Sequence, residues 1–180
     1  MKIEIIKITD INLMRKACWF TTGGLSANRI TLSKMYSCEH SPAVTQHFWI
    51  EMEGIPHSAS SHLVRHKIGV DHFVQSFRPD RYKEQNSNKL MTLKQFRDRP
   101  VNHAMDVNAL ALIHMSHKRL CYNSEHPTVQ VMRQLKEDMQ KVDGELSRFM
   151  VPSCIHLGRC PELIECKYGV ENIKKIYDKP

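Results

Sequence analysis

Cationic, amide and hydroxyl side chains gather between residues 65 and 81, in the order Arg65, His66, Lys67, Gln75, Ser76, Arg78 and Arg81. Guanidinium groups form planar forks that match phosphate oxygens or a carbonyl edge, and amide and hydroxyl groups add hydrogen bonds. The four arginines and lysines of this 17-residue stretch would repel one another unless an anion, or the carboxylates of Asp71 and Asp80, offset their charge. The segment therefore predicts phosphate binding, and the alternative is a solvated basic loop.

Two histidines further along the chain, His114 and His117, lie one helical turn apart. This spacing would let them chelate a metal ion. No carboxylate is spaced with them, however, and Lys118 and Arg119 would oppose a cation. We therefore expect His114 to contact a ligand instead of a metal.

Cysteines form a third set of candidate residues. Cys154, Cys160 and Cys166 recur every six residues, and with Cys121 they supply the four sulfurs of a zinc site or an iron–sulfur site. The spacing is wider than the Cys-x-x-Cys of common zinc modules. The alternative is that these thiols are small buried hydrophobic groups, and for the other two cysteines, Cys18 and Cys38, we expect a place in the core.

The composition is that of a globular protein with an excess of positive charge. The chain has 180 residues, which favours one domain over residues 1–180, and a formal net charge of +7 with a pI near 9.2. Such an excess fits a partner rich in phosphate, either a nucleotide, a cofactor or a nucleic acid, and the alternative is that the charge serves solubility. Nucleic acid is the less favoured partner, because aromatic residues make up only 7% and the arginines cluster in one loop instead of lining a helix.

The sequence shows no targeting or membrane segment. Its first residues, MKIEIIKITD, lack the apolar stretch of a signal peptide. No window approaches the roughly 18 apolar residues of a membrane span. We therefore expect a protein of the cytoplasm (of the host, if a phage encodes it), where thiols stay reduced.

The elements that must position these side chains begin with strands. Residues 2–8 and 44–55 are rich in β-branched and aromatic residues and predict strands. Asp10 is a predicted N-cap for a helix through Leu13, Met14 and Ala17, a short helix is expected over 31–38, and Pro56 opens a helix to about Lys67. Residues 21–29 predict a loop.

The second half of the chain predicts mainly helices. Residues 71–103 are polar and irregular and predict a long binding loop. Strong helix formers predict a helix over 104–121, and apolar residues at steps of three and four predict an amphipathic helix from Pro127 to Phe149. Strands early and helices late indicate an α+β fold.

Three segments together resemble one family. The residues "RHK…QSFR" are similar to the signature of the flavin-dependent thymidylate synthases, which is Arg-His-Arg, seven residues and then Ser in a context such as Gln-Ser-x-Arg. "EHSP" at 39–42 resembles a short family segment ahead of the first long strand. "NALALIHMSHKR" at 108–119 resembles a family helix that ends with an arginine. The joint presence of "HLVRHKIG" and "VPSC…CPE…C" further resembles a compact, phage-type branch of this family.

The resemblance implies a fold, an activity and a set of ligands. Members have a mixed or antiparallel sheet flanked by long helices, bind FAD, take reducing equivalents from NADPH and transfer a one-carbon unit from methylenetetrahydrofolate to C5 of dUMP. They are homotetramers whose sites are assembled from several subunits. The family needs no cysteine nucleophile, so none of the six cysteines has to be catalytic.

Individual residues receive roles from the same resemblance. The residues that match flavin-binding positions are Ser41, Arg65, His66, Lys67, Asn108 and His114. The residues that match substrate-binding positions are Gln75, Ser76, Arg78 and Arg119, of which Ser76 and Arg119 are the catalytic candidates. A fixed guanidinium at Arg119 would stabilise the negative charge that builds on the pyrimidine carbonyls when C5 is activated.

The chain departs from the family pattern at both ligand sites. Lys67 replaces an arginine, eight residues instead of seven precede Ser76, His72-Phe73 replaces Asn-Glu, and Leu110 stands where an arginine is usual. These departures keep three alternatives open. They are dCMP as the substrate, hydroxymethylation as the transfer, and a non-catalytic nucleotide- or nucleic-acid-binding protein.

Overall fold

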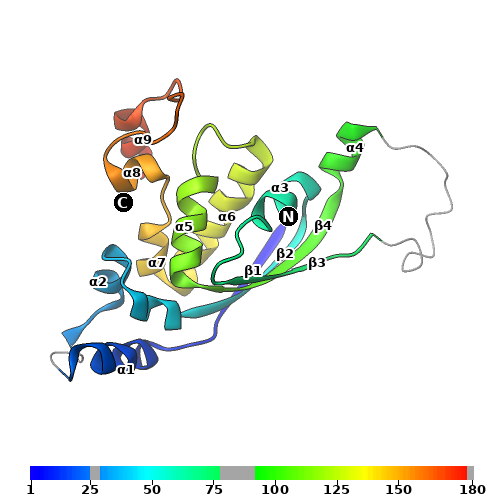
Figure 1. Ribbon diagram of the computed structural model, residues 1–180. Coiled ribbons are helices and arrows are strands. Elements are labelled where there is room, and N and C mark those ends of the chain that lie inside the picture. Colours follow the sequence, from blue (N-terminus) through cyan, green and yellow to red (C-terminus); the bar gives the residue numbers. More distant parts are fainter. Residues whose placement is uncertain (25–28, 78–91, 178–180) are drawn as a thin grey trace.

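The computed structural model describes residues 1–24, 29–77 and 92–177 (Figure 1). The centre of the fold is a four-stranded sheet with the order β1-β2-β4-β3, in which every pair of neighbours is antiparallel. The strands are β1 (Lys2–Lys7), β2 (His47–Pro56), β3 (Val70–Val74) and β4 (Pro100–Asn108). The α+β class and the antiparallel sheet are therefore confirmed.

Buried and more exposed side chains alternate along the two central strands, β2 and β4, and this alternation shows which face of the sheet is buried. Phe48, Ile50 and Met52 of β2 are at most 1% exposed, and Ile50 lies opposite Met105 of β4 in the register. The residues between them, such as Trp49, point to the other face, because successive side chains of a strand alternate. One face therefore packs against helices, and the other carries exposed and half-exposed side chains.

Ten helical elements are described. They are α1 (Ile11–Thr22), α2 (Leu32–Ser37), the 3-10 helix η2 (Ser41–Thr45), α3 (His57–Leu63), α4 (Leu93–Asp98), α5 (Ala109–Arg119), α6 (His126–Val142), α7 (Gly144–Phe149), α8 (Ser153–Leu157) and α9 (Val170–Tyr177). Helices α3, α5 and α6 contact strands of the sheet, and α7 packs against α6 (Figure 1). None of the helices in the described ranges has both the length and the apolar character that crossing a membrane would take.

The predicted long loop over 71–103 is wrong in part. Strand β3 covers its beginning, and α4 and the first part of β4 cover its end. The alternation of Val101, His103 and Met105, all at most 1% exposed, marks β4 as half-buried, but a histidine at a core position conceals this pattern in the sequence. Asp80, Arg78 and Arg81 lie outside the described residues.

Two predicted helices are shorter than expected. The helix expected over 104–121 begins only at Ala109, because residues 104–108 continue β4, and Asn108 caps α5 by accepting a hydrogen bond from the backbone N–H of Ala111 at 2.9 Å. The helix expected to run to Phe149 is interrupted at Asp143. The predicted N-cap at Asp10 is confirmed, since its side chain accepts from two backbone N–H groups of α1.

The buried carboxylate of Asp143 explains the break between α6 and α7. Its Oδ2 accepts from Lys7 Nζ at 2.6 Å and from the Tyr36 hydroxyl at 3.2 Å, and its Oδ1 caps α7 at the N–H of Leu146. These three partners compensate a side chain whose residue is only 6% exposed. Asp143 thus joins β1, α2 and α7 at one point.

The core is one continuous cluster of apolar residues from the sheet and the helices. Cys18 belongs to it at 2% exposure, as predicted. Cys38 does not, because it follows the last turn of α2 and is exposed. The core prediction for Cys38 was therefore wrong.

Candidate active site

Five of the six predicted flavin-binding residues line one cavity of about 520 Å³. This cavity, named here the arginine–histidine cavity, is lined by Val44, Arg65, His66, Lys67, Ile68, Gly69, Asn108, Leu110, Ala111 and His114. The Arg-His-Lys triplet follows the end of α3, and the other polar residues come from the start and the middle of α5. Ser41 is exposed at the start of η2 and is not part of the lining, although Val44 of the same helix is.

A glycine lets the triplet approach α5. Gly69 has φ +72°, and a Cβ added there would lie 2.2 Å from Nδ2 of Asn108. The carbonyl of Gly69 accepts from the backbone N–H of Asn108 at 3.0 Å. Only glycine combines this left-handed backbone with so close an approach, so Gly69 sets the distance between the triplet and α5.

The predicted pyrimidine-binding arginine is held by the predicted flavin-binding histidine. Arg119 Nε donates to His66 Nε2 at 2.9 Å. Burial, and after it the charges of Arg119 and His72, lower the pKa of His66 to about 4. His66 is therefore neutral at pH 7 and can accept this hydrogen bond, with its own proton on Nδ1.

Two cations in this region lack a carboxylate partner within the described ranges, since neither Arg65 nor Arg119 forms an ion pair there. Burial, and then the charge of Arg65, lower the pKa of Arg119. The repulsion between two guanidinium groups is relieved when an anion binds. The arrangement is thus suited to a phosphorylated ligand.

The side chains of Ser60, His103 and His72 form a hydrogen-bonded relay that ends at the backbone of the Arg-His-Lys triplet. This relay was not predicted from the sequence. His72 Nε2 donates to the carbonyl of His66 at 2.7 Å, so a neutral His72 accepts at Nδ1. His103 Nε2 lies 2.9 Å from that atom, and Ser60 Oγ lies 3.0 Å from His103 Nδ1. When both rings are neutral, the direction of hydrogen-bond donation is fixed: Ser60 donates to His103, His103 donates to His72, and His72 donates to the carbonyl of His66.

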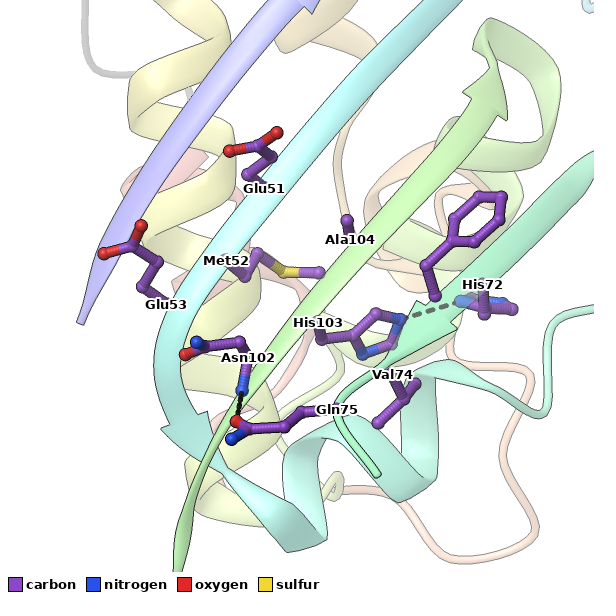
Figure 2. Close-up of a pocket in the computed structure, with 10 residues that line it drawn as sticks. Glu51, Met52, Glu53, His72, Val74, Gln75, Asn102, His103 and Ala104 are labelled. Atoms are coloured by element: carbon purple, nitrogen blue, oxygen red, sulfur yellow. Dashed lines mark hydrogen bonds between the residues drawn. The ribbon is translucent and has the colours of Figure 1, made fainter. Parts of the chain in front are cut away.

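The relay crosses two neighbouring strands. Figure 2 shows His103 of β4 and His72 of β3 facing each other, joined by the hydrogen bond. Burial, and then the charge of His72, lower the pKa of His103 to about 4. Residue spacing does not reveal that β3 pairs with β4, so the contact between His72 and His103 could not be predicted from the sequence. One hint of the relay was present in the sequence, which was that His72 departs from the family pattern.

Gln75, a predicted substrate-binding residue, lines a second cavity. This cavity, named here the sheet cavity, measures about 600 Å³ and is lined by Glu51, Met52, Glu53, His72, Phe73, Val74, Gln75, Asn102, His103 and Ala104. Gln75 Oε1 accepts from the backbone N–H of Asn102 at 3.0 Å (Figure 2). Within the described chain, Gln75 and Arg119 thus line different cavities. Of the other two predicted substrate-binding residues, Ser76 follows Gln75 directly, and Arg78 lies outside the described residues.

Arg119 lines neither of these two cavities but a third, smaller one at the end of α5. This helix-end cavity of about 280 Å³ is lined by Lys118, Arg119, Cys121, Asn123, Ser124 and Glu162. Next to it lies a fourth cavity, of about 20 Å³, named here the cysteine cavity, whose lining includes Cys121, Cys154, Cys160 and Cys166. The structure therefore brings the four predicted metal-binding cysteines together, and all four thiols are free.

A carboxylate accompanies the histidine pair of α5, contrary to the expectation from sequence. Glu39 Oε2 lies 2.8 Å from His114 Nε2, and Glu39 Oε1 lies 3.2 Å from His117 Nε2 and 3.4 Å from His156 Nε2. Glu39 precedes His114 by 75 residues, so no local spacing reveals it. Both ring nitrogens of His117 face acceptors, since its Nδ1 is 2.8 Å from the carbonyl of Val151.

This cluster offers ligand atoms but already has internal partners. One atom each from Glu39, His117 and His156 lie within 4.8 Å of one another. Burial alone would raise the pKa of Glu39, but hydrogen bonds from His114 and His117 outweigh burial and lower it. A charged carboxylate paired with imidazoles is therefore sufficient to account for the cluster.

Comparison with known proteins shows a likeness of fold but no match to a family model or to a curated sequence. Solved structures with a similar arrangement of sheet and helices include flavin-dependent thymidylate synthases and a nucleotide methylase, and their identities of 13–14% make this a likeness of fold.

Two crystal structures represent thymidylate synthase X (ThyX) from Helicobacter pylori with FAD and dUMP. One has a TM-score of 0.59 at 14% identity and covers 83% of this chain and 97% of its own. The other has a TM-score of 0.60 at 13% identity and covers 82% and 99%. The UMP/dUMP methylase PolB from Streptomyces cacaoi, bound with 5-Br dUMP, has a TM-score of 0.55 at 13% identity and covers 82% and 94%.

Proposed function

We propose that this chain is a flavin-dependent, thymidylate synthase-like enzyme that methylates dUMP at C5, with FAD as cofactor and NADPH and methylenetetrahydrofolate as co-substrates. The observation that carries the proposal is the arginine–histidine cavity. It gathers Arg65, His66, Lys67, Asn108 and His114, which were assigned to the flavin from sequence alone. It does so in a fold shared with proteins that were crystallised with FAD and dUMP.

The residues of the cavity fit a flavin. Two cationic side chains, Arg65 and Lys67, face no carboxylate among the lining residues that the structure describes, which suits a pyrophosphate. Leu110, Ala111 and Ile68 add apolar surface for a planar ring. The volume of about 520 Å³ falls within the usual range of ligand sites.

The protein's part in the reaction would be to bind, orient and polarise. His66 holds Arg119 through Nε, which leaves the Nη groups of the guanidinium for the carbonyls of a pyrimidine. There the cation would stabilise the charge that develops when C5 is activated. A bound flavin supplies the redox chemistry, and the protein supplies alignment and electrostatics.

The separation of candidate residues between cavities supports an assembled site. Gln75 lines the sheet cavity and Ser41 stands outside the arginine–histidine cavity. A homotetramer, in which a site is completed by other subunits, would bring such residues to the same ligand. We further propose the compact, phage-type branch and a cytoplasmic location, and light scattering of the purified protein measures the number of subunits.

A related transfer is the second candidate. PolB acts on UMP and dUMP within the same fold, and Lys67, His72 and Leu110 depart from the family pattern at the ligand sites. Methylation or hydroxymethylation of dUMP or dCMP is therefore the alternative. A protein that binds a nucleotide or nucleic acid without catalysis would bind its ligand but release no product.

The decisive experiment separates flavin binding from turnover. FAD fluorescence is titrated with wild-type protein, with Arg65→Ala and with Arg148→Ala, a control whose exposed arginine pairs with Glu145 on α7. Loss of one charge-assisted hydrogen bond, about 1.5–3 kcal/mol, should weaken FAD binding by roughly 10- to 150-fold in Arg65→Ala only.

Turnover is then measured with FAD, NADPH and methylenetetrahydrofolate, with dUMP and dCMP offered in parallel and the product identified by mass. The proposal predicts dTMP. Equal FAD affinity in all three proteins, or FAD binding without any product, would contradict it.

A further inference from the structure

The cysteine cavity is formed by segments that are distant in the sequence. Cys121 follows α5, Cys154 lies in α8, and Cys160 and Cys166 belong to the segment between α8 and α9. Cys154 is only 8% exposed and the other three are half-buried. The proposed reaction needs no thiol, so this convergence calls for its own explanation.

We propose that Cys121, Cys154, Cys160 and Cys166 bind one structural zinc ion. Four thiolates form the ligand set of closed, tetrahedral zinc sites, with Zn–S bonds of about 2.3 Å. The cavity measures about 20 Å³, which is about the space that one water molecule occupies. A space of this size suits a single ion better than an iron–sulfur cluster, which is larger.

The donor set of the cavity suits a soft cation. Four thiolates cannot share so small a space without a positive charge between them, and a bound zinc ion deprotonates its thiol ligands. The backbone N–H of Asn123 donates to Cys121, and hydrogen bonds of this kind orient metal ligands.

The segment between α8 and α9 has few other means of holding its place. Its apolar side chains are exposed, with Leu163 fully exposed and Ile164 at 80%. A hydrogen bond of 2.8 Å from Asn123 Nδ2 to the carbonyl of Ile164 connects it to the end of α5. All four cysteines line the cavity, but in the described part of the chain no three of their sulfurs lie within 4.8 Å of one another. Zinc binding would therefore have to draw the sulfurs, and this segment, inward.

The site would also fix the end of α5. Cys121 and Glu162 line both the cysteine cavity and the helix-end cavity, to which Arg119 contributes. Zinc bound to Cys121 would therefore hold the helix end that carries Arg119. Metal binding itself does not depend on the proposed reaction, and either can fail without the other.

Metal content tests the proposal directly. The full chain is purified without chelator, and zinc is measured in the wild type, in Cys160→Ser, in Cys166→Ser and in Cys38→Ser, whose cysteine is exposed and outside the cavity. We expect about one zinc ion per chain in the wild type and in Cys38→Ser, and almost none in the other two variants. Titration of the apo wild type with Co²⁺ alone should produce thiolate-to-cobalt charge-transfer bands and the intense visible bands of tetrahedral cobalt.

A thiol titration of the wild type makes the test independent of how serine variants fold. With zinc bound, an aromatic disulfide reagent should react rapidly with Cys38 and slowly with the four cysteines of the cavity, and a chelator should release those four. Wild type without zinc and with four rapidly reacting cavity thiols would overturn the site. So would two disulfides among these cysteines, or iron together with acid-labile sulfide.

Discussion

The neutral state of His103 makes the stability of the fold depend on pH in a defined direction. Burial and the charge of His72 lower the pKa of His103 from 6.5 to about 4. The unfolded chain therefore takes up a proton near pH 6.5 that the folded chain takes up only near pH 4. Because the unfolded state binds more protons between these values, the free energy of unfolding falls as the pH falls through this range and levels off below it.

The expected magnitude follows from the same two values. At 1.36 kcal/mol for each pH unit by which they differ, His103 should destabilise the fold by about 3 kcal/mol at about pH 4 relative to neutral pH. Solvent screening does not reduce this effect, because His103 is only 1% exposed. His66, whose pKa is also lowered to about 4, acts in the same direction, but it is partly exposed and contributes less.

The assay is urea unfolding between about pH 7 and about pH 4.5, followed by tryptophan fluorescence, for the wild type and for His103→Gln. Glutamine can accept from Ser60 and donate to His72, so it keeps both bonds without the titration. The variant should lose stability less steeply on acidification, whereas His126→Gln, at an exposed histidine of α6, should follow the wild type.

A direct observation completes the test. The ring resonance of His103 in the wild type, followed by NMR, should not titrate between pH 7 and about 5. Equal pH slopes in the wild type and in His103→Gln, with a His103 ring that titrates near 6.5, would refute the reasoning. The relay from Ser60 to the His66 carbonyl would then have a different proton arrangement.

Three further predictions concern the site and its surroundings. Arg119→Lys should reduce dUMP affinity by at least about tenfold without changing the unfolding midpoint, because an ammonium cannot replace the Nε–H donor and the planar fork together. Glu39→Gln should be less stable than the wild type at neutral pH, and since the pKa of Glu39 lies below its usual 4.5, this difference should vanish as the pH falls through the lowered value. Gly69→Ala should destabilise more than Gly54→Ala: both glycines have positive φ, but only at Gly69 would a Cβ collide with Asn108, so Gly54→Ala should lose only about 1–2 kcal/mol.

Each of these predictions has an outcome that contradicts it. Wild-type nucleotide affinity in Arg119→Lys would remove this arginine from the site. A constant stability difference for Glu39→Gln down to the lowest pH would mean that its carboxylate is not stabilised by the histidines. Equal losses in the two glycine variants, measured by urea unfolding, would show that Gly69 matters for its backbone angle alone.

Local patterns predicted much of the fold. The β-branched residues of 2–8, the N-cap at Asp10 and the short helix near 31–38 depend on neighbours in the sequence, and all three were confirmed. Strand β4 was missed because His103 occupies a core position and breaks the apolar alternation. The end of α6 was missed because Asp143 is compensated by Lys7 and Tyr36, which lie more than a hundred residues away.

The candidate site shows the same division. The triplet at 65–67 and the helix at 108–119 were recognisable as motifs, and they line one cavity. The histidine relay depends on the pairing of β3 with β4, and Glu39 reaches α5 across 75 residues. Contacts of this kind arise from tertiary structure, so no local spacing could have indicated them.

The link between Lys7 and Asp143 has a consequence for how the chain acquires its structure during synthesis. The two residues are 136 positions apart, so the ammonium group of Lys7 lacks its native carboxylate partner until residue 143 has emerged from the ribosome. β1 and β2 can pair much earlier, since they are joined by a shorter connection. Bringing Lys7 and Asp143 together closes a longer loop, which costs more conformational entropy than pairing β1 with β2. The nascent chain must therefore keep an incomplete sheet soluble until α6 and α7 have been synthesised and can cover it.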